Sequence, residues 1–360
     1  MSTRLHARRL ACSALLSTVL LVLAGCSSGA TTPDPDPTPT TPTVTTALDD
    51  YVAAGSVEVA NLRSVAVSRG GQVLADRYYD SSAAEYMGVE SVTKSVISTL
   101  VGVALAEGKL TSLDQTVGEL LPQDRALMKK ATAAITVREL LTMKASWAEL
   151  PEGTTMESTE LVRRVLQVGP DQIGTFSYNN VAPHILSAIL VQVTGQSTLD
   201  YARAKLFDPL GIETRPAYEG PLASLDTPSY AAATSFTWLV DPDGVHAGFS
   251  SIKLTTGDML KLGQLYLDEG MWQGRQLVPA SYIAEATAPQ PGDYGYLWWS
   301  RPIANHPAYE AFGSFGQMIM VVEDLDLVVV ASSRPSDTAP QDQEYLIRMV
   351  ETYVVPNLPA

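Results

Sequence analysis

The chain has 360 residues, of which 46% are hydrophobic and 18% charged, and this composition supports a sizeable core and excludes a fully disordered protein. At about 100–200 residues per domain, the length allows one large domain or two interleaved ones. The formal net charge is −15, although the first 25 residues hold three arginines and no acid. The rest carries 21 Lys and Arg against 39 Asp and Glu, and because such an acidic body repels phosphate backbones we expect no nucleic-acid partner.

The N-terminus has the pattern of an export signal over residues 1–25. Three arginines precede the short apolar run Leu10–Leu23, which falls below the ~20 residues that a membrane-spanning helix needs. The run ends in Leu23-Ala24-Gly25-Cys26, which resembles the bacterial lipobox, where cleavage leaves the cysteine as the lipidated N-terminus. An ordinary signal peptide that contains a cysteine is the alternative, and Arg8-Arg9 is compatible with a twin-arginine signal. We expect a lipid anchor on Cys26 at the outer face of the bacterial cell membrane.

Residues 26–46 form the expected linker. After Cys26 the segment is rich in proline and threonine and has almost nothing apolar to bury, so it favours extended, solvated polyproline II. The folded body is then residues 47–360. Both cysteines, Cys12 and Cys26, precede it, which excludes disulfides, cysteine nucleophiles and cysteine-based metal sites from the body.

The first predicted elements of the body are a helix, a hairpin and a second helix. Helical spacing covers Ala47–Leu62, and two strand patterns, Ser64–Ser68 and Gln72–Tyr79, meet at Gly70-Gly71. A long apolar-periodic helix is predicted over Ser91–Glu107, with Gly108 suited to its C-terminal cap.

Helical patterns continue to about Ile212, and the last part returns to strands. Met318–Val322 and Leu327–Ser333 predict a hairpin, followed by a closing helix over Gln341–Val355. We therefore expect an α+β fold in which both ends of the body complete one antiparallel sheet flanked by helices. Its α/β part comprises about 47–85 and 235–360, and the inserted, mainly helical part comprises about 86–234.

The first candidate catalytic motif is Ser91-Val-Thr-Lys94 at the start of the long helix. A spacing of three places the hydroxyl and the amine on one helix face. A neutral, buried lysine can accept the serine proton, and the helix N-terminus offers free N–H groups to an oxyanion. A simple N-cap role for Ser91 is the alternative. A second such motif, Ser250…Lys253, is interpreted as chance.

Two further segments carry groups that could relay a proton or bind a substrate. Thr175–Asn180 can be read as Ser177-x-Asn179 or as Tyr178-x-Asn180, in which a hydroxyl relays a proton and an amide orients the substrate; a plain turn is the alternative. Phe312–Gln317 leads into a predicted strand, and its glycines would let a substrate lie against the strand edge; a bulged strand is the alternative.

These three elements in this order resemble the serine beta-lactamase and penicillin-binding protein superfamily. The resemblance is to its class C beta-lactamase-like group, which includes family VIII esterases and 6-aminohexanoate-dimer hydrolases, and it covers about Leu48 to Val354. The segments that carry it, besides the three motifs, are Gly88–Ser95, Leu113–Pro122, Ile135–Met143, Gly195–Tyr201, Leu206–Ile212, Gly263–Leu267, Trp272–Ala280 and Tyr294–Trp299.

The resemblance implies a beta-lactamase/transpeptidase-like fold and a role for each motif residue. Ser91 would be the acylated nucleophile, Lys94 its general base, Tyr178 the proton shuttle and Asn180 the orienting amide. The backbone N–H groups of Ser91 and Gln317 would form the oxyanion hole. The implied mechanism is acyl transfer through an acyl-enzyme, and it requires no metal and no cofactor.

The chain departs from the family pattern at the third motif, Ser314-Phe315-Gly316, where many members offer a cationic side chain. We therefore expect a small neutral ester or amide as substrate. The alternatives are a beta-lactamase or DD-peptidase, with a carboxylate anchor elsewhere such as Arg301, and a penicillin- or cell-wall-binding lipoprotein without turnover.

Aromatic and histidine residues near these motifs are expected to be structural. Trp147 either lines the site or packs beneath it. Trp238, Trp298 and Trp299 are each either core or pocket wall, with core positions preferred, and His184 is expected to be structural or part of a pocket wall.

Overall fold

The computed structural model describes residues 43–55, 59–147, 150–225, 227–289, 292–334 and 343–360. The expected signal peptide, Cys26 and nearly all of the linker lie outside the described residues. Across the part that is described, no helix is both long and apolar enough to cross a membrane.

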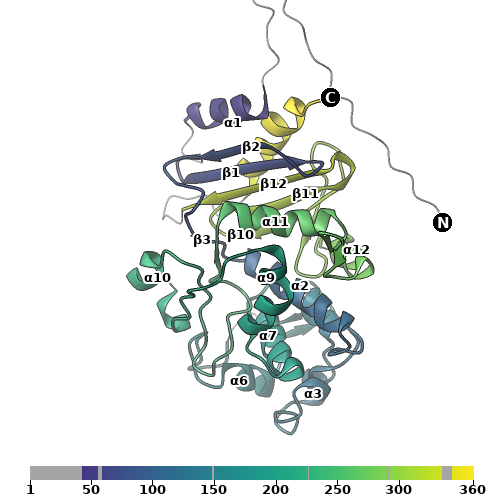
Figure 1. The fold of residues 1–360 in the computed structure, drawn as a ribbon. Helices are drawn as coiled ribbons and strands as arrows, with labels where there is room; N and C mark the ends of the chain where they lie inside the picture. The colour runs from purple at the N-terminus through teal and green to yellow at the C-terminus, as the bar shows by residue number, and fades with distance from the viewer. Residues whose placement is uncertain (1–42, 56–58, 148–149, 226, 290–291, 335–342) are drawn as a thin grey trace, which may run out of the picture. The chain divides into compact units, whose positions relative to one another are not determined.

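A six-stranded antiparallel sheet lies at the centre of the α/β part (Figure 1). Its strand order is β2-β1-β12-β11-β10-β9, so the first strand of the body pairs with the last and both ends complete the sheet, as predicted. The strands are β1 (Leu62–Arg69), β2 (Gln72–Tyr78), β9 (Trp299–Ser300), β10 (Ala308–Gly313), β11 (Gln317–Val322) and β12 (Leu327–Ser333).

Both predicted hairpins form. Gly70 and Gly71 adopt φ values of 55° and 73°, and two left-handed residues are what a tight turn between twisted strands requires; Arg69 then pairs with Gln72. The hairpin of β11 and β12 closes through a short 3₁₀ turn, η4 (Glu323–Leu325).

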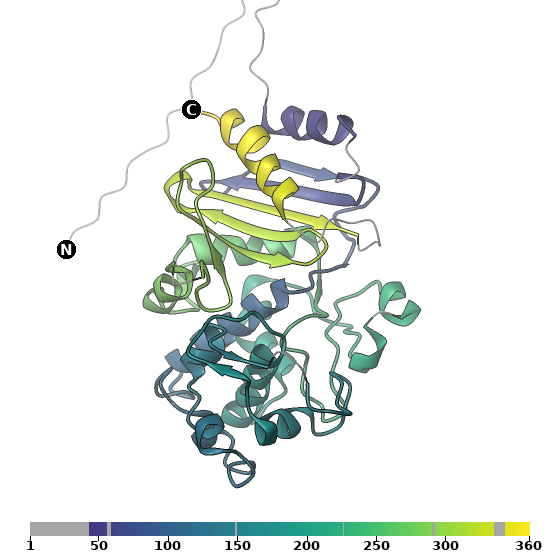
Figure 2. The same cartoon turned by 180° about the vertical axis from the view of Figure 1, so that it is seen from behind.

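Helices cover both faces of the sheet. Along β11, Met318 and Met320 pack with α1 (Val44–Ala53) and α13 (Glu344–Met349), whereas Ile319 and Val321 face the other core. This alternation follows the two-residue period of a strand. Figure 2 shows the C-terminal helix lying across the sheet on the side of α1, and α11 (Thr256–Leu267) covers the opposite face (Figure 1).

Of the two predicted terminal helices, the first ends earlier than expected and the second is confirmed. The expected helix over Ala47–Leu62 is wrong beyond Ala53, because Gly55 at φ 68° leaves the helical region and Leu62 already begins β1. The closing helix is confirmed from Glu344, and it continues beyond α13 as a π-helical turn, η5 (Val350–Val354), and a 3₁₀ turn, η6 (Val355–Asn357).

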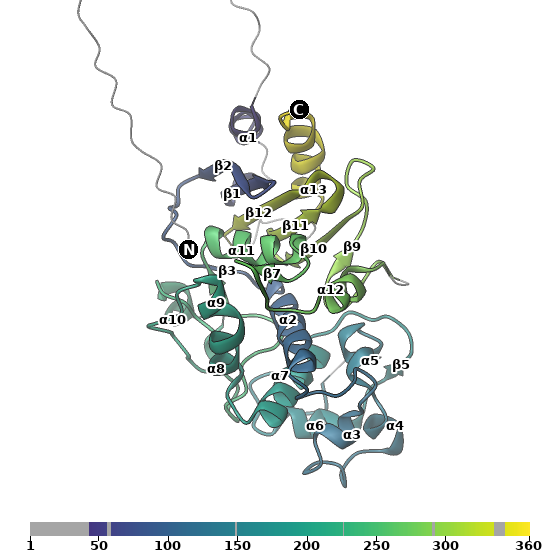
Figure 3. The same ribbon diagram turned by 45° about the vertical axis from the view of Figure 1, so that its right-hand side comes forward.

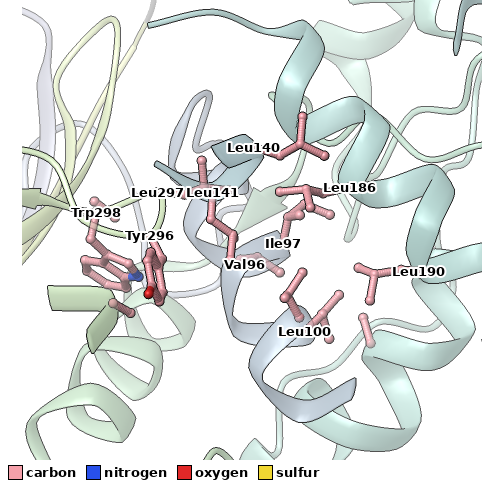
Figure 4. Packing of buried hydrophobic residues seen from close by; sticks show 14 of the residues in the cluster. Val96, Ile97, Leu100, Leu140, Leu141, Leu186, Leu190, Tyr296, Leu297 and Trp298 are labelled. Carbon is pink, nitrogen blue, oxygen red and sulfur yellow. The ribbon is translucent and has the colours of Figure 1, made fainter. Parts of the chain in front are cut away.

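The long helix α2 (Val92–Ala106) connects the sheet to the helical part, and its residues are buried from Val92 to Ala104. In Figure 3 it runs down from the sheet with α7 (Val181–Thr194) beside it. Its apolar side chains, among them Ile97 and Leu100, pack between leucines of neighbouring helices and the Tyr296–Trp298 segment (Figure 4).

Short elements complete the body. The remaining helices are α3 (Val117–Leu120), α4 (Lys130–Ala133), α5 (Val137–Leu141), α6 (Leu161–Val168), α8 (Thr198–Ala202), η2 (Arg203–Phe207), α9 (Asp208–Leu210), η3 (Leu222–Ser224), α10 (Pro228–Ala232) and α12 (Ala280–Thr287). The remaining strands are β3 (Met87–Gly88), β4 (Ala145–Ser146), β5 (Gln172–Ile173), β6 (Lys253–Leu254), β7 (Met271–Trp272) and β8 (Arg275–Gln276).

Candidate active site

Ser91 lies at the N-terminus of α2, where it makes no side-chain capping bond. Its hydroxyl oxygen instead accepts a hydrogen bond of 2.8 Å from Nζ of Lys94, so the N-cap alternative does not hold. The preceding residue, Glu90, has φ 47°, a left-handed conformation that costs a residue with a side chain about 1 kcal/mol or more. Such backbone strain is common at functional sites.

Lys94 is buried, with 1% of its surface exposed. Its amine also donates to the backbone carbonyl of Phe249 at 3.0 Å. Burial disfavours the ammonium form and lowers the pKa of Lys94 to about 7, although the Glu90 carboxylate opposes this shift. A lysine in this state can exchange a proton with Ser91 near neutral pH.

Tyr178 is the third member of the group. The Lys94 amine lies over its ring, 4.9 Å from the centroid. Although 39% of Tyr178 is exposed, desolvation raises the pKa of its phenol to about 12, against the opposing effect of a side-chain hydrogen bond with Ser91. The phenol therefore stays protonated at neutral pH and can donate a proton rather than take one.

The contacts differ between the two frames of the second motif. Asn179 is buried, and its amide donates to the carbonyls of Ala145 and Ser177 while its oxygen accepts from the Ala182 N–H. Ser177 accepts a hydrogen bond from Ser146. These two side chains hold the turn, whereas Tyr178 reaches Ser91 and Lys94.

Asn180 immediately precedes α7 and is exposed, and its side chain makes no capping bond. It therefore remains the amide of this motif that a substrate can reach.

The third motif forms the turn between β10 and β11. A Cβ added to Gly313 would lie 2.6 Å from the Val89 carbonyl oxygen, which places this turn against the segment that leads into Ser91. The Gln317 side chain is fully buried and bonds to Ser333 and Phe315, so only its backbone is a candidate for contact with substrate. Ser314 and Phe315 are half-buried.

Arg301 is wrong as a carboxylate anchor for this site. Its guanidinium pairs with the buried Glu310 at 2.7 Å and with Glu344 at 3.6 Å. It lines a cavity of about 790 Å³ formed mainly by α12 and the β9–β10 region, whose lining does not include Ser91, Lys94 or Tyr178.

The tryptophans divide between core and site. Trp147 is buried and donates to the Val165 carbonyl, so it packs beneath the site, and Trp238 and Trp298 are core residues as expected. Trp299 is not: its ring stacks on Tyr178, with centroids 5.6 Å apart and planes at 24°. Trp298, just before β9, is fully buried, whereas Trp299 is partly buried and packs at the edge of the same core.

The second Ser-x-x-Lys motif does not form such a group. Lys253 donates to three backbone carbonyls, those of Tyr230, Ala231 and Ala233, and Ser250 donates to Glu90. This geometry agrees with the prediction that the Ser250…Lys253 spacing is a chance match to the motif.

Sequence reasoning missed the Phe249 carbonyl, because a backbone acceptor has no residue signature. It also assigned no particular partner to His184, which is buried against Asp241 with 3.1 Å between His184 Nε2 and Asp241 Oδ2. A histidine and an aspartate far apart in the chain give no spacing from which to predict contact.

Comparisons with known proteins agree with this fold. The sequence profile of the Beta-lactamase family matches residues 45–352. No curated protein sequence matches the chain.

Three similar solved structures have the same architecture. A penicillin-binding protein homologue from Caulobacter crescentus is 17% identical, with a TM-score of 0.68 over 89% of this chain and 99% of that one. A proposed 6-aminohexanoate-dimer hydrolase from Bacillus anthracis is 19% identical, with a TM-score of 0.65 over 87% and 82%. A class C beta-lactamase from Rhodobacter sphaeroides is 18% identical, with a TM-score of 0.64 over 87% and 99%.

These structures share the fold that the sequence predicts, and the family profile spans the body from α1 to the C-terminal helix. The chain therefore belongs to the beta-lactamase family of serine hydrolases.

Proposed function

We propose that this protein forms an acyl-enzyme at Ser91 and hydrolyses a small, neutral ester or amide. The observation that carries the proposal is the 2.8 Å hydrogen bond between the buried Lys94 amine and the Ser91 hydroxyl. With a pKa of about 7, this amine is neutral in about half of the molecules at pH 7. It can therefore remove the serine proton as the hydroxyl attacks.

The proposed steps combine this geometry with the roles that the family resemblance implies. Ser91 Oγ bonds to the substrate carbonyl carbon while its proton passes to Lys94, and the carbonyl electron pair moves to the oxygen. Backbone N–H groups of Ser91 and Gln317 stabilise that oxyanion. When the leaving group departs it takes a proton from Tyr178, which Lys94 restores. Water then attacks the acyl-enzyme by the same route and releases the acid.

The proposed substrate class rests on charge and aromatic surface. Ser314 and Phe315 offer no cation where a substrate carboxylate would lie, and Arg301 is paired with Glu310. Tyr178 and Trp299 present a stacked aromatic surface beside the nucleophile, which favours apolar acyl or alcohol groups. One similar structure, the proposed 6-aminohexanoate-dimer hydrolase from Bacillus anthracis, is named for a substrate that is not a beta-lactam.

Active-site labelling tests the proposal. A fluorophosphonate should modify the full chain once, at Ser91, and mass spectrometry of its peptides should locate the adduct. Ser91→Ala should remain unlabelled. Ser250→Ala, in the second Ser-x-x-Lys motif, is the matched control and should be labelled like wild type.

Turnover then separates the substrate classes. We expect hydrolysis of a short-chain p-nitrophenyl ester and little turnover of a chromogenic cephalosporin. Rapid cephalosporin turnover would favour the beta-lactamase alternative. Labelling without turnover of either substrate would favour a binding lipoprotein. Absence of labelling at Ser91 would contradict the proposed acyl-enzyme mechanism.

We also propose that the chain is exported and lipid-anchored through Cys26, on the strength of the apolar run and lipobox-like residues that precede this cysteine. Cells fed a labelled fatty acid should incorporate it into wild type but not into Cys26→Ala, which should leave the membrane fraction. Incorporation into Cys26→Ala would refute the anchor.

A further inference from the structure

His184, on α7, is a buried histidine with both ring nitrogens engaged. Its Nε2 lies 3.1 Å from Asp241 Oδ2, and its Nδ1 accepts the Gly248 N–H at 3.4 Å. Only 1% of His184 and 3% of Asp241 is exposed. Because Nδ1 accepts a hydrogen bond it carries no proton, so Nε2 holds the proton and donates it to the Asp241 carboxylate.

Asp241 is itself fixed. Its second oxygen, Oδ1, accepts backbone N–H groups from Asp243 at 2.9 Å and Val245 at 2.8 Å. Burial raises the pKa of Asp241, but hydrogen bonds from His184 and from these two backbone groups outweigh it and hold the pKa below its usual value. The carboxylate therefore sets which histidine nitrogen carries the proton.

The chain from His184 continues to the catalytic lysine. Gly248 precedes Phe249, whose carbonyl oxygen accepts the Lys94 amine at 3.0 Å, and the Phe249 ring packs edge-on against His184 with centroids 6.0 Å apart. Any displacement of residues 248–249 therefore moves an acceptor of the Lys94 amine.

Neighbouring backbone groups are held in the same way. The His246 carbonyl accepts from Ser187 at 2.7 Å, and the Ala247 carbonyl accepts from the Trp238 indole at 2.9 Å. Four successive residues, 246–249, are thus each tied through a backbone group to a buried side chain. Three of these hydrogen bonds are to Ser187, Trp238 and His184, and the fourth is to Lys94.

Resting on the proposed function, we propose that His184 and Asp241 form a positioning pair for Lys94: the pair fixes the backbone of residues 248–249, and the Phe249 carbonyl directs the lysine amine at Ser91. Neither residue is bonded to Ser91 among the described residues, so they act through the backbone. The Phe249 carbonyl dipole favours the ammonium form of Lys94. Displacing this carbonyl should therefore lower the lysine pKa and misdirect its amine.

Asp241→Asn tests the pair with almost no change of shape. The asparagine oxygen must keep the two backbone N–H groups of Asp243 and Val245, which leaves its NH₂ facing His184 Nε2. Nε2 then has to accept, so the imidazole proton moves to Nδ1 and points at the Gly248 N–H. Two donors cannot share that position, so the Gly248 N–H is pushed away and the backbone of residues 248–249 moves with it.

The readout is the pH profile of kcat/KM for a p-nitrophenyl ester. In wild type we expect activity to rise with pH through about 7, as Lys94 loses its proton. Asp241→Asn should lower the plateau about 10- to 100-fold and shift the acid limb to lower pH. Glu219→Gln changes a second histidine–carboxylate pair, with His246 at 3.2 Å, and should leave the acid limb in place.

A second measurement does not depend on activity. Long-range ¹H–¹⁵N spectra of the histidine rings should show the Nε2–H form of His184 in wild type and the Nδ1–H form in Asp241→Asn. The inference is overturned if wild type holds the proton on Nδ1, or if Asp241→Asn lowers the melting temperature while the acid limb stays unchanged. A wild type without an acid limb near 7 would instead contradict Lys94 as the base, and the tautomer of His184 would still be measurable.

Discussion

Replacing Lys94 with methionine should lower kcat/KM for a p-nitrophenyl ester by about 10³- to 10⁴-fold and at the same time stabilise the folded protein. The loss of rate follows because, among the residues that the structure describes, no other side chain bonds the Ser91 hydroxyl as a base: Tyr178, with a pKa of about 12, is protonated at neutral pH. The gain in stability follows from the burial of the amine.

The direction of that gain can be worked out from the two pKa values. The unfolded lysine titrates near 10.5 and the folded one near 7, so between these values the unfolded state binds the proton and stability rises with pH. The cost of burying the amine is therefore greatest at and below pH 7, at most about 5 kcal/mol. Leaving the Phe249 carbonyl without its donor costs about 1–3 kcal/mol, so we expect a net gain of about 1–3 kcal/mol at pH 7 that shrinks toward pH 10.

Urea unfolding at pH 7 and pH 9.5 measures this difference. The matched control is Lys253→Met, which removes a second buried lysine but leaves three carbonyl oxygens without donors and should destabilise the fold. A Lys94→Met protein should be more stable than wild type at pH 7 and should keep less than a tenth of the wild-type activity. Either opposite result would contradict the assignment of Lys94 as the buried general base.

Replacing Gly248 with alanine should destabilise the protein by about 3 kcal/mol, at the upper end of the usual cost of overpacking, and should remove most of its activity. An added Cβ would lie 2.0 Å from the Pro183 carbonyl oxygen and 2.9 Å from the His184 Cα. These are backbone atoms, so α7 or the backbone of residues 248–249 has to move, and the Phe249 carbonyl that accepts the Lys94 amine moves with it.

Gly257→Ala is the control for this change. Its Cβ would meet only the Thr255 hydroxyl, at 3.9 Å, inside α11, where alanine is a better helix former than glycine. We expect it to be neutral or slightly stabilising. Thermal unfolding and ester turnover of both variants give the comparison, and a Gly248→Ala protein as stable and active as wild type would show that this backbone contact is looser than described.

Much of the fold could be predicted because local signals and topology agree. Gly70-Gly71 between two alternating runs specifies a hairpin, and apolar periodicity up to Gly108 specifies α2. The end of α1 was missed because the apolar spacing continues to Leu62, whereas the structure ends α1 at Ala53 and begins β1 at Leu62. Periodicity reports which residues are buried and cannot by itself report where a helix stops.

The candidate site was predictable where its residues lie close in sequence. Ser91 and Lys94 share one helix turn, and their hydrogen bond follows from that spacing. Choosing Tyr178 over Ser177 needed the resemblance, and the geometry agrees with the choice. Trp299, the Phe249 carbonyl and the His184–Asp241 pair could not be found in this way, because their positions are set by tertiary contacts between distant segments.

The pairing of β1 with β12 has a consequence for when Ser91 becomes reactive. Lys94 is buried on α2, which packs against α7, β10 and β11, and its amine bonds to the Phe249 carbonyl. The strands that close this sheet are among the last parts of the chain to be synthesised. Until they are in place, Lys94 is a solvated ammonium and Ser91 an ordinary alcohol. An unfinished or partly unfolded chain therefore lacks the buried lysine on which the proposed mechanism depends.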